Sequence, residues 1–178
     1  MRVIAGSLGG RTFASPHGHK THPMSEKARG AIFNALGDVE GLTVLDVFAG
    51  SGALSIEALS RGSSGAVAVD NDKNACRTMR ENAALLGLKP NLTVIQQNAA
   101  SWSENSTDTK FDIIFADPPY DNLQPAIAQK LPRHLGADSI LVLSWPGGEE
   151  LPEIQGTTSV ARKDFGDIQI GFYRRDHD

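Results

Sequence analysis

Short apolar runs alternate with segments of helical periodicity from residue 42 onward. The apolar runs predict buried strands, and the periodic segments between them predict helices that cover a sheet. The predicted strands are residues 42–47, 66–69, 92–96, 111–116 and 139–144. The predicted helices are residues 53–61, 73–86 and 123–131. Strands that alternate with helices of this length specify a parallel, doubly wound α/β sheet.

Both ends of the chain depart from this alternation. Residues 157–163 and 168–174 flank the sequence Asp164-Phe165-Gly166-Asp167 and predict a terminal antiparallel hairpin. Near the start, residues 2–5 and 11–14 flank a glycine turn and predict a small β-hairpin. The mostly parallel sheet is therefore expected to carry a hairpin at each end of the chain.

Between the N-terminal hairpin and the sheet, Ser25 can cap a helix that runs to about Leu36, and Gly37 is a suitable stop. Residues 15–23 combine turn formers with basic and histidine residues, so we predict a loop. Residues 101–110 form the most polar stretch of the chain and are predicted to be an exposed loop.

The chain has 178 residues, the size of one domain. We expect a single domain over residues 1–178, with residues 1–23 as a basic extension and residues 24–178 as the core. Cys76 is the only cysteine, which excludes an intrachain disulfide and a Cys-rich zinc site. No apolar run approaches the roughly 18 residues of a membrane span, and the N-terminus has no long apolar signal core. A monomeric cytoplasmic protein without a membrane partner is expected.

Charge is unevenly distributed along the chain. Residues 1–30 hold five Lys or Arg side chains and one Glu, whereas the remaining residues hold twelve Lys or Arg and twenty Asp or Glu. A basic arm on an acidic body predicts contact with a polyanion such as RNA, and a solvated face without a partner is the alternative. The histidines of residues 17–22 lack a second ligand cluster, so no metal is expected. The candidate RNA-binding residues are Arg2, Arg11, Lys20 and Arg29.

A glycine-rich turn follows the first predicted strand of the sheet. Open α/β sheets bind ligands at the carboxyl ends of their strands, and glycine lets the backbone approach a ligand closely. A dinucleotide fingerprint would need a third glycine where Ser55 stands. An acid at Asp46 suits instead the cationic amine of S-adenosylmethionine (AdoMet), and an ordinary strand-to-helix turn is the structural alternative. The candidate cofactor residues here are Asp46, Phe48, Ala49, Gly50, Ser51 and Gly52.

Two further strand ends carry polar residues that suit a nucleoside. Asp70 ends the next strand, and its carboxylate can accept both ribose hydroxyls of AdoMet or of a dinucleotide. Asn98 follows the third strand and can accept a hydrogen bond from the adenine amino group. Both residues also fit structural roles, as a helix cap or a turn residue. The adjoining Asn71 and Ala99 complete the candidate set.

The sharpest signal is Asp117-Pro118-Pro119-Tyr120, directly after a buried strand. Two prolines fix φ and remove two N–H donors, so this segment predicts a rigid entrance to a ligand site. The Asp117 carboxylate and the Pro118 carbonyl can each accept one hydrogen of a planar NH₂ group, which turns its lone pair toward an electrophile. Tyr120 can stack on the ring that carries the amine. We predict that Asp117, Pro118, Pro119 and Tyr120 are catalytic, that Asp117 also contacts the cofactor, and that the sulfonium methyl is the electrophile.

These motifs resemble those of a known family. Residues 46–52 resemble motif I of class I AdoMet-dependent methyltransferases, and residues 117–120 resemble motif IV of the amino-methyltransferases. The whole chain is similar to the bacterial 16S rRNA guanine-N2 methyltransferases of the RsmD type, especially over residues 48–62. The resemblance implies a Rossmann-like, seven-stranded sheet with one antiparallel strand. It also implies AdoMet as the cofactor, S-adenosylhomocysteine as the product, and transfer to N2 of one guanine in 16S rRNA or an assembling small subunit.

By the same resemblance, Asp70 takes the ribose, residues 117–120 hold the guanine, and the basic arm meets RNA. The chain departs from the family at His22, where Arg is usual and a protonated His would partly replace it as an RNA contact. It also has Asp70 where Glu is usual and Asn98 where Asp is commoner. The motifs leave open other amino acceptors (adenine N6, cytosine N4 or a protein glutamine), a catalytically silent AdoMet- or RNA-binding module, and a nicotinamide dehydrogenase.

Overall fold

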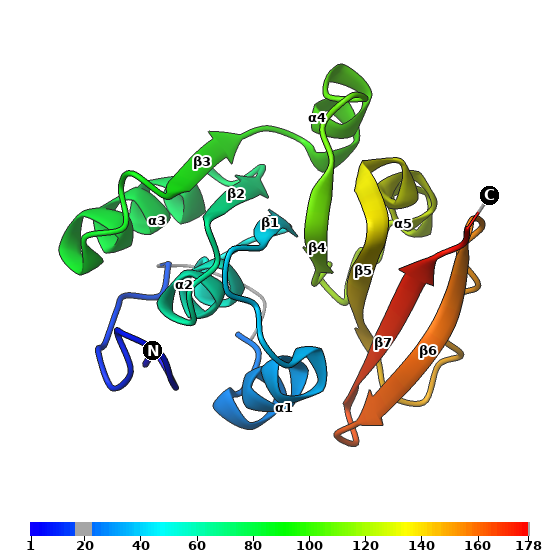
Figure 1. The fold of residues 1–178 in the computed structure, drawn as a ribbon, viewed down its shortest axis with the longest axis horizontal. Coiled ribbons are helices and arrows are strands. Elements are labelled where there is room, and N and C mark those ends of the chain that lie inside the picture. The colour runs from blue at the N-terminus through cyan, green and yellow to red at the C-terminus, as the bar shows by residue number, and fades with distance from the viewer. Residues whose placement is uncertain (17–22, 178) are drawn as a thin grey trace.

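A computed structural model describes residues 1–16 and 23–177 and shows one seven-stranded sheet in the order β3-β2-β1-β4-β5-β7-β6 (Figure 1). The strands from β3 to β5 are parallel, and β7 runs antiparallel to both β5 and β6. The predicted sheet and its C-terminal antiparallel hairpin are confirmed. The strands are β1 (Thr43–Val47), β2 (Gly65–Asp70), β3 (Leu92–Gln96), β4 (Phe111–Ala116), β5 (Leu135–Pro146), β6 (Thr157–Asp164) and β7 (Ile168–Arg175).

Helices cover both faces of the sheet and enclose two hydrophobic cores (Figure 1). One face is covered by α1 (Glu26–Leu36), α2 (Ala53–Ser60) and α3 (Lys73–Leu86). The other face is covered by α4 (Ala99–Asn105), α5 (Pro125–Lys130) and the 3₁₀ turn η1 (Leu131–His134). In the described part of the chain, no helix has the length and apolar character needed to cross a membrane.

The carboxyl ends of the central strands are level with one another. Val47, the last residue of β1, pairs with Val69 of β2 on one side and with Ala116 of β4 on the other. Ala116 pairs in turn with Leu143 of β5. The segments that leave these strands therefore emerge side by side at one edge, which is where open α/β sheets form their ligand sites.

The polar stretch after β3 differs from the prediction of an exposed loop over residues 101–110. Its first half belongs to α4, because the Asn98 side chain caps that helix and Trp102 and Ser103 are buried. The predicted helix over residues 123–131 is shorter, beginning at Pro125. The other core helices and strands lie at the predicted places, with ends shifted by a few residues.

The predicted N-terminal hairpin is reduced to a single antiparallel bridge between Arg2 and Thr12. Its apolar residues are nevertheless firmly packed, since Val3 and Phe13 are buried in a third cluster with side chains of α2 and α3. Residues 1–16 thus lie against the helices that follow β1 and β2. The helix after them is as predicted: Ser25 accepts the N–H of Ala28 at 3.1 Å.

Candidate functional site

Three carboxylates gather at the carboxyl edge of the sheet. Asp46 lies in β1, Asp70 ends β2, and Asp117 directly follows β4. They are near enough that the charges of Asp117 and Asp70 both contribute to raising the pKa of Asp46. Within residues 1–16 and 23–177, no group of three or more His, Cys, Asp or Glu side chains is placed to hold a metal ion. The ends of β1, β2 and β4 therefore bring three carboxyl groups together at this edge.

Asp46 is held inside the protein, with 1% of its surface exposed. Burial raises the pKa of Asp46 to about 8, against the opposing effect of hydrogen bonds from Ser55. The Ser55 hydroxyl donates to Oδ2 of Asp46 at 2.7 Å, and the Ser55 N–H donates at 3.3 Å. The serine that breaks the dinucleotide fingerprint is thus the partner of the strand acid, and the pair fixes the first turn of α2 against β1.

The glycine turn between β1 and α2 needs its glycines. Gly50 and Gly52 have φ angles of 58° and 79°, and a Cβ atom at Gly52 would lie 3.0 Å from Cγ of Met79. Phe48 also has a positive φ, 61°, which is costly for a bulky residue and typical of functional turns. Gly52 starts α2 without a side-chain cap, so the helix presents backbone N–H groups toward this edge.

Asp70 ties the glycine turn to β2. Its Oδ2 accepts the N–H of Gly50 at 2.8 Å, and its Oδ1 accepts the N–H of Asp72 at 2.8 Å. Each carboxylate oxygen has a second lone pair that remains available to a ligand. Asp70 therefore shapes the turn and still has the acceptor capacity that a ribose requires. Its neighbour Asn71 is exposed, and Ser51 in the turn is partly exposed.

Asn98 caps a helix, which is the structural alternative to the predicted contact with adenine. Its Oδ1 accepts the N–H groups of Ala100 and Ser101 at 2.9 and 3.2 Å, which caps α4. Both lone pairs of that oxygen are thus engaged, so the predicted acceptance of an adenine amino hydrogen by Asn98 is corrected. The exposed Asn98 amide can instead donate through its NH₂ group, and the adjacent Ala99 is buried.

The predicted catalytic segment forms a rigid corner at the end of β4. Asp117 is partly buried, Pro118 is buried and Tyr120 keeps 40% of its surface exposed. Burial raises the pKa of Asp117 to about 6, although a hydrogen bond from Ser144 lowers it. Burial also raises the pKa of Tyr120 to about 12. The Tyr120 hydroxyl contacts Ser144 and the carbonyl of Trp145 at the end of β5.

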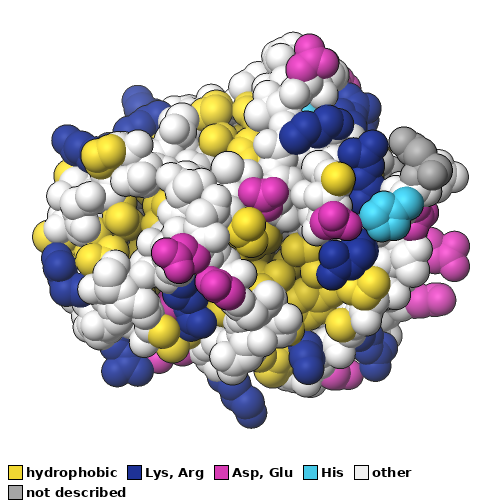
Figure 2. All heavy atoms as spheres, viewed as in Figure 1, with side chains coloured by type: hydrophobic (Ala, Val, Ile, Leu, Met, Phe, Trp, Pro, Cys, Tyr) yellow, Lys and Arg dark blue, Asp and Glu magenta, His cyan; other side chains and the backbone are white. Residues whose placement is uncertain are grey.

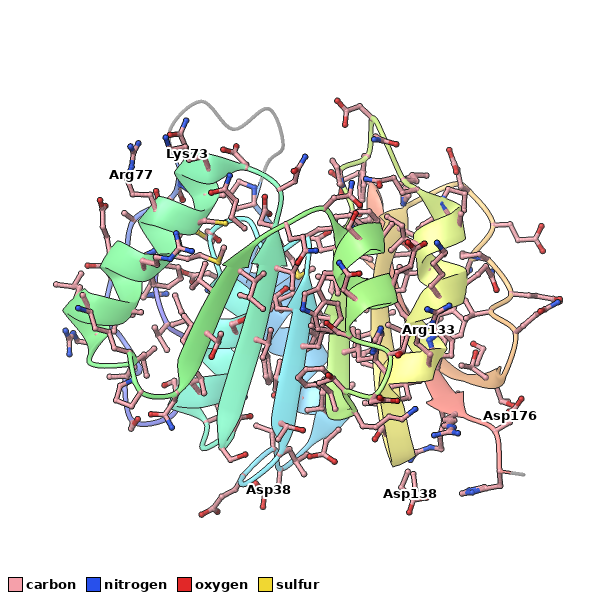
Figure 3. The ribbon with its side chains drawn as sticks, turned by 90° about the horizontal axis from the view of Figure 1, so that it is seen from above. Asp38, Lys73, Arg77, Arg133, Asp138 and Asp176 are labelled. Carbon is pink, nitrogen blue, oxygen red and sulfur yellow. The ribbon has the colours of Figure 1, made fainter. Side chains whose placement is uncertain are left out.

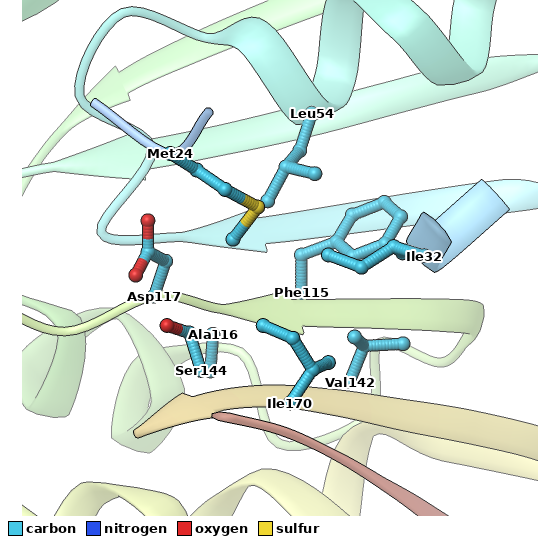
Figure 4. A pocket seen from close by; sticks show the side chains of 9 residues that line it. All are labelled: Met24, Ile32, Leu54, Phe115, Ala116, Asp117, Val142, Ser144 and Ile170. Carbon is cyan, nitrogen blue, oxygen red and sulfur yellow. The ribbon is translucent and has the colours of Figure 1, made fainter. Parts of the chain in front are cut away.

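A narrow pocket lies beside Asp117 of the catalytic corner (Figure 4). Asp117 and Ser144 form its polar end, and Met24, which precedes α1, lies beside them. Leu54, two residues beyond Gly52 in α2, also lines the pocket. The pocket therefore extends from the catalytic corner to the first turn of α2, the helix that follows the glycine turn. The remaining walls are apolar and come from Ile32, Phe115, Ala116, Val142 and Ile170.

Arg29 is not the surface RNA contact that its place in the basic arm predicts. It is 1% exposed, and its Nε lies 3.7 Å from Oε1 of Glu57, which is equally buried. Its Nη2 donates to the backbone carbonyl of Arg2. Glu57 also accepts the N–H groups of Ile4 and Ala5, at 2.9 and 3.1 Å. Arg29 and Arg61, whose Nε lies 2.9 Å from Oε2 of Glu57, both contact this internal carboxylate. Its burial removes Arg29 from the RNA-binding candidates.

The other predicted RNA contacts fall into two groups. Arg2 and Arg11 are exposed; Arg2 pairs with Glu26 at 2.9 Å, and Arg11 donates to the carbonyl of Leu85 at 3.3 Å. Lys20 and His22 lie outside the described residues. In the view of Figure 2, Lys and Arg side chains lie over several parts of the surface together with Asp and Glu side chains.

Sequence reasoning missed exposed cations on α3. Lys73 and Arg77, in the first turns of this helix, lie near the carboxyl edge of the sheet, whereas Asp38 and Asp138 lie at the opposite edge (Figure 3). The helix prediction over residues 73–86 already contained the signal, because a helix that follows β2 begins at the carboxyl edge. Ser144 was missed too, although it ends a predicted strand.

Comparison with known proteins identifies the family of this chain. Residues 1–174 match the family model described as Conserved hypothetical protein 95. "Putative rRNA methyltransferase YlbH" of Bacillus subtilis is 35% identical over 98% of this chain and 99% of its own length. Ribosomal RNA small subunit methyltransferase D of Escherichia coli is 36% identical over 67% of this chain and 60% of its own.

A solved structure extends the likeness to the whole fold. "Putative methyltransferase yhhF from Escherichia coli" superimposes with a TM-score of 0.88 and 29% identity, covering 99% of this chain and 98% of that one. The order and direction of the strands, the glycine turn after β1 and the Asp-Pro-Pro-Tyr corner after β4 agree with this assignment. The chain belongs to the family described as Conserved hypothetical protein 95, the family of the ribosomal RNA small subunit methyltransferase D proteins, and has the class I methyltransferase fold.

Proposed function

We propose that this protein transfers a methyl group from AdoMet to the exocyclic N2 amine of a guanine in 16S rRNA. One observation carries the proposal: the glycine turn and the Asp-Pro-Pro-Tyr corner leave neighbouring strands at the same level, since Val47 of β1 pairs with Ala116 of β4. The named relatives support ribosomal RNA as the substrate. We place the protein in the cytoplasm as a monomer of one domain, acting on free rRNA or on an assembling small subunit.

The donor side of the site consists of the glycine turn and the acids beside it. The backbone from Phe48 to Gly52 would hold the methionine part, and the start of α2 would face its carboxylate. Asp70 would accept ribose hydroxyl hydrogens through the lone pairs that Gly50 and Asp72 leave available. Asn71, Asn98 and Ala99 would lie along the adenosine. The negative charges at this edge complement a cofactor that supplies, when bound, an electrophilic methyl group on a positively charged sulfur.

The acceptor side consists of the corner after β4. The Asp117 carboxylate and the Pro118 carbonyl each hold one hydrogen of the amine, which aims the nitrogen lone pair at the donor side. Tyr120 stacks on the base through its exposed ring. As the N–C bond forms, the S–C bonding pair stays on sulfur. Asp117 holds the surplus N–H proton and receives it or passes it to water. A base in folded RNA must leave its stack to reach this corner.

The test is transfer of a labelled methyl group to 16S rRNA and to small subunits that lack the modification, followed by mass spectrometry of the nucleosides. We expect N2-methylguanosine with the wild type and at least about a hundredfold less with Asp117→Ala. Asp108→Ala is the matched control, because Asp108 is an exposed acid outside the site, and it should retain full activity.

Each other result has a defined meaning. A labelled adenine, cytosine or protein glutamine would overturn the guanine assignment and keep the amine chemistry. AdoMet binding without transfer to any substrate would favour a silent binding module. Binding of a nicotinamide dinucleotide in place of AdoMet, measured by calorimetry, would overturn the donor assignment altogether.

A further inference from the structure

Ser144 occupies a special place at the end of β5. It is 2% exposed, and it directly follows Leu143, which is level with Ala116 of β4. Ser144 is therefore the β5 counterpart of Asp117, the first residue after β4. A hydroxyl at this place is buried beside the catalytic corner without being part of its sequence motif.

The Ser144 hydroxyl contacts Tyr120. Its Oγ lies 2.9 Å from the Tyr120 hydroxyl oxygen, which also donates to the backbone carbonyl of Trp145 at 3.1 Å. These contacts fix the phenol end of the ring to β5. The ring face, on which a base would stack, is set by this anchor, because Tyr120 is otherwise 40% exposed.

The same hydroxyl reaches Asp117. A hydrogen bond from Ser144 opposes the rise in the pKa of the Asp117 carboxyl. Both side chains line the polar end of the pocket, with the serine oxygen directed toward the carboxylate (Figure 4). An ionised carboxylate only accepts hydrogen bonds, so the serine proton points to Asp117. The single Tyr120 proton is then shared between the serine oxygen and the carbonyl oxygen of Trp145.

We propose that Ser144 is a positioning residue of the acceptor site, whose single hydroxyl links Tyr120 to Asp117 and fixes both for the incoming amine. The inference rests on the proposed function and adds to it a residue outside the Asp-Pro-Pro-Tyr motif. One side chain thereby sets the acceptor for the amine hydrogens and the orientation of the stacking ring.

Ser139 provides a matched control on the same strand. It is 1% exposed, and its hydroxyl donates to the nearby carbonyl of Ala137 at 3.5 Å. Ser139→Ala therefore measures the cost of removing a buried hydroxyl from β5 far from the corner. Ser144→Thr keeps the hydroxyl and should retain the behaviour of the wild type, whereas Ser144→Ala removes it.

The experiment compares these variants in methyl transfer and in AdoMet binding. For Ser144→Ala we expect kcat to fall about tenfold or more, since a hydrogen bond to a charged group is lost, with AdoMet affinity within about twofold of wild type. The acid limb of the kcat profile should move up by about one pH unit, because Asp117 must be ionised to accept the amine. Asp46 and, on the Tyr120 side, Asp167 face this cluster in every variant, so the difference isolates the hydroxyl.

A second measurement needs no substrate. The Asp117 carboxyl carbon is titrated by NMR in the wild type and in Ser144→Ala, with Asp117→Asn to assign the signal, and the alanine variant should titrate at higher pH. An unchanged titration and an unchanged kcat profile would overturn the role of Ser144 while wild-type methyl transfer still stood. Absence of transfer by the wild type would count against the proposed function alone, and the titration would still decide the role of Ser144.

Discussion

The backbone N–H of Gly50 lies 2.8 Å from Oδ2 of Asp70, so the turn after β1 and the end of β2 form one unit. Asp70→Ala removes this link together with the proposed ribose acceptor. We expect AdoMet affinity to fall about tenfold to a hundredfold, the range for a charge-assisted hydrogen bond, as measured by calorimetry. Asp70→Asn keeps one acceptor oxygen, so its AdoMet affinity should lie between those of the wild type and Asp70→Ala.

Asp112→Ala is the matched control for this loss. Oδ2 of Asp112 also accepts a backbone N–H, that of Thr43 at 2.9 Å, but at the opposite edge of the sheet. It should leave AdoMet affinity unchanged. Equal losses in the two variants would show that stability, rather than ligand contact, explains the effect of Asp70.

Gly52→Ala should damage both stability and cofactor binding. Gly52 directly precedes α2, and its positive φ would cost an alanine about 1–2 kcal/mol. The new Cβ would also lie 3.0 Å from Cγ of Met79 in α3. Gly87→Ala separates the two effects, because Gly87 has a φ of 72° but nothing within 4 Å of an added Cβ. Thermal melts and AdoMet titrations should show a shared loss of stability and a binding loss only at Gly52.

The stability of the protein should depend on the ionisation of Asp46. The pKa of Asp46 is raised from 3.8 to about 8 in the fold, so between these values the native state holds one proton more than the unfolded chain. The free energy of unfolding should therefore fall as pH rises, by at most about 1.4 kcal/mol per pH unit from this group. Asp46→Asn should remove that slope in denaturant titrations at pH 5–8.

The same experiment contains an opposite contribution from His134. Burial lowers the pKa of His134, so this residue stabilises the fold above pH 6.5 and loses that contribution as the pH falls. The His134 contribution is the same in the wild type and in Asp46→Asn, so the difference between their free energies of unfolding reports Asp46 alone. Parallel curves for the two proteins would show that the Asp46 carboxyl ionises as readily in the native state as in the unfolded chain.

Arg29→Met should lower stability without altering the salt dependence of RNA binding. Removing Arg29 takes one cation away from the buried Glu57 carboxylate, while Arg61 still pairs with it at 2.9 Å, so we expect a loss of about 1–3 kcal/mol. Arg2→Met should have little effect on stability, since both Arg2 and Glu26 are exposed. A reduced salt slope for Arg29→Met in a filter-binding assay would restore Arg29 as a phosphate contact.

Lys73 and Arg77 should contribute to RNA affinity because they are exposed near the carboxyl edge of the sheet (Figure 3). Replacing each by alanine should weaken binding and reduce the slope of log K against log salt by about one unit if each contacts a phosphate. Arg133→Ala is the control, since Arg133 precedes β5 at the other edge. Equal slopes for all three variants would place the RNA elsewhere.

Local signals in the sequence predicted most of the sheet. The helix Lys73–Leu86 has the predicted ends, because Asp72 caps its start and Gly87 adopts the left-handed conformation at its end. The helix α4 was missed because its cap, Asn98, was interpreted as a ligand residue and its buried Trp102 stands in a strongly polar segment.

The residues of the site were harder to predict where tertiary contacts decide their role. Arg29 stands in a basic segment that suits RNA contact, yet it is buried beside Glu57, which is 28 residues away along the chain. Ser144 acquires its place only through the pairing of β4 with β5. The places of Asp46, Asp70 and Asp117 were predictable, since each lies at or next to the carboxyl end of a strand whose position in a parallel sheet is fixed by topology.

The Glu57 carboxylate has a consequence for proteolytic damage. Glu57 lies in α2, the short helix that follows Gly52, and accepts the N–H groups of Ile4 and Ala5. Clipping the first few residues would leave that carboxylate short of two donors inside the protein. A nick at the extreme amino end would thus disturb the helix that faces the cofactor, so intact mass is a necessary check on any preparation whose AdoMet affinity is low.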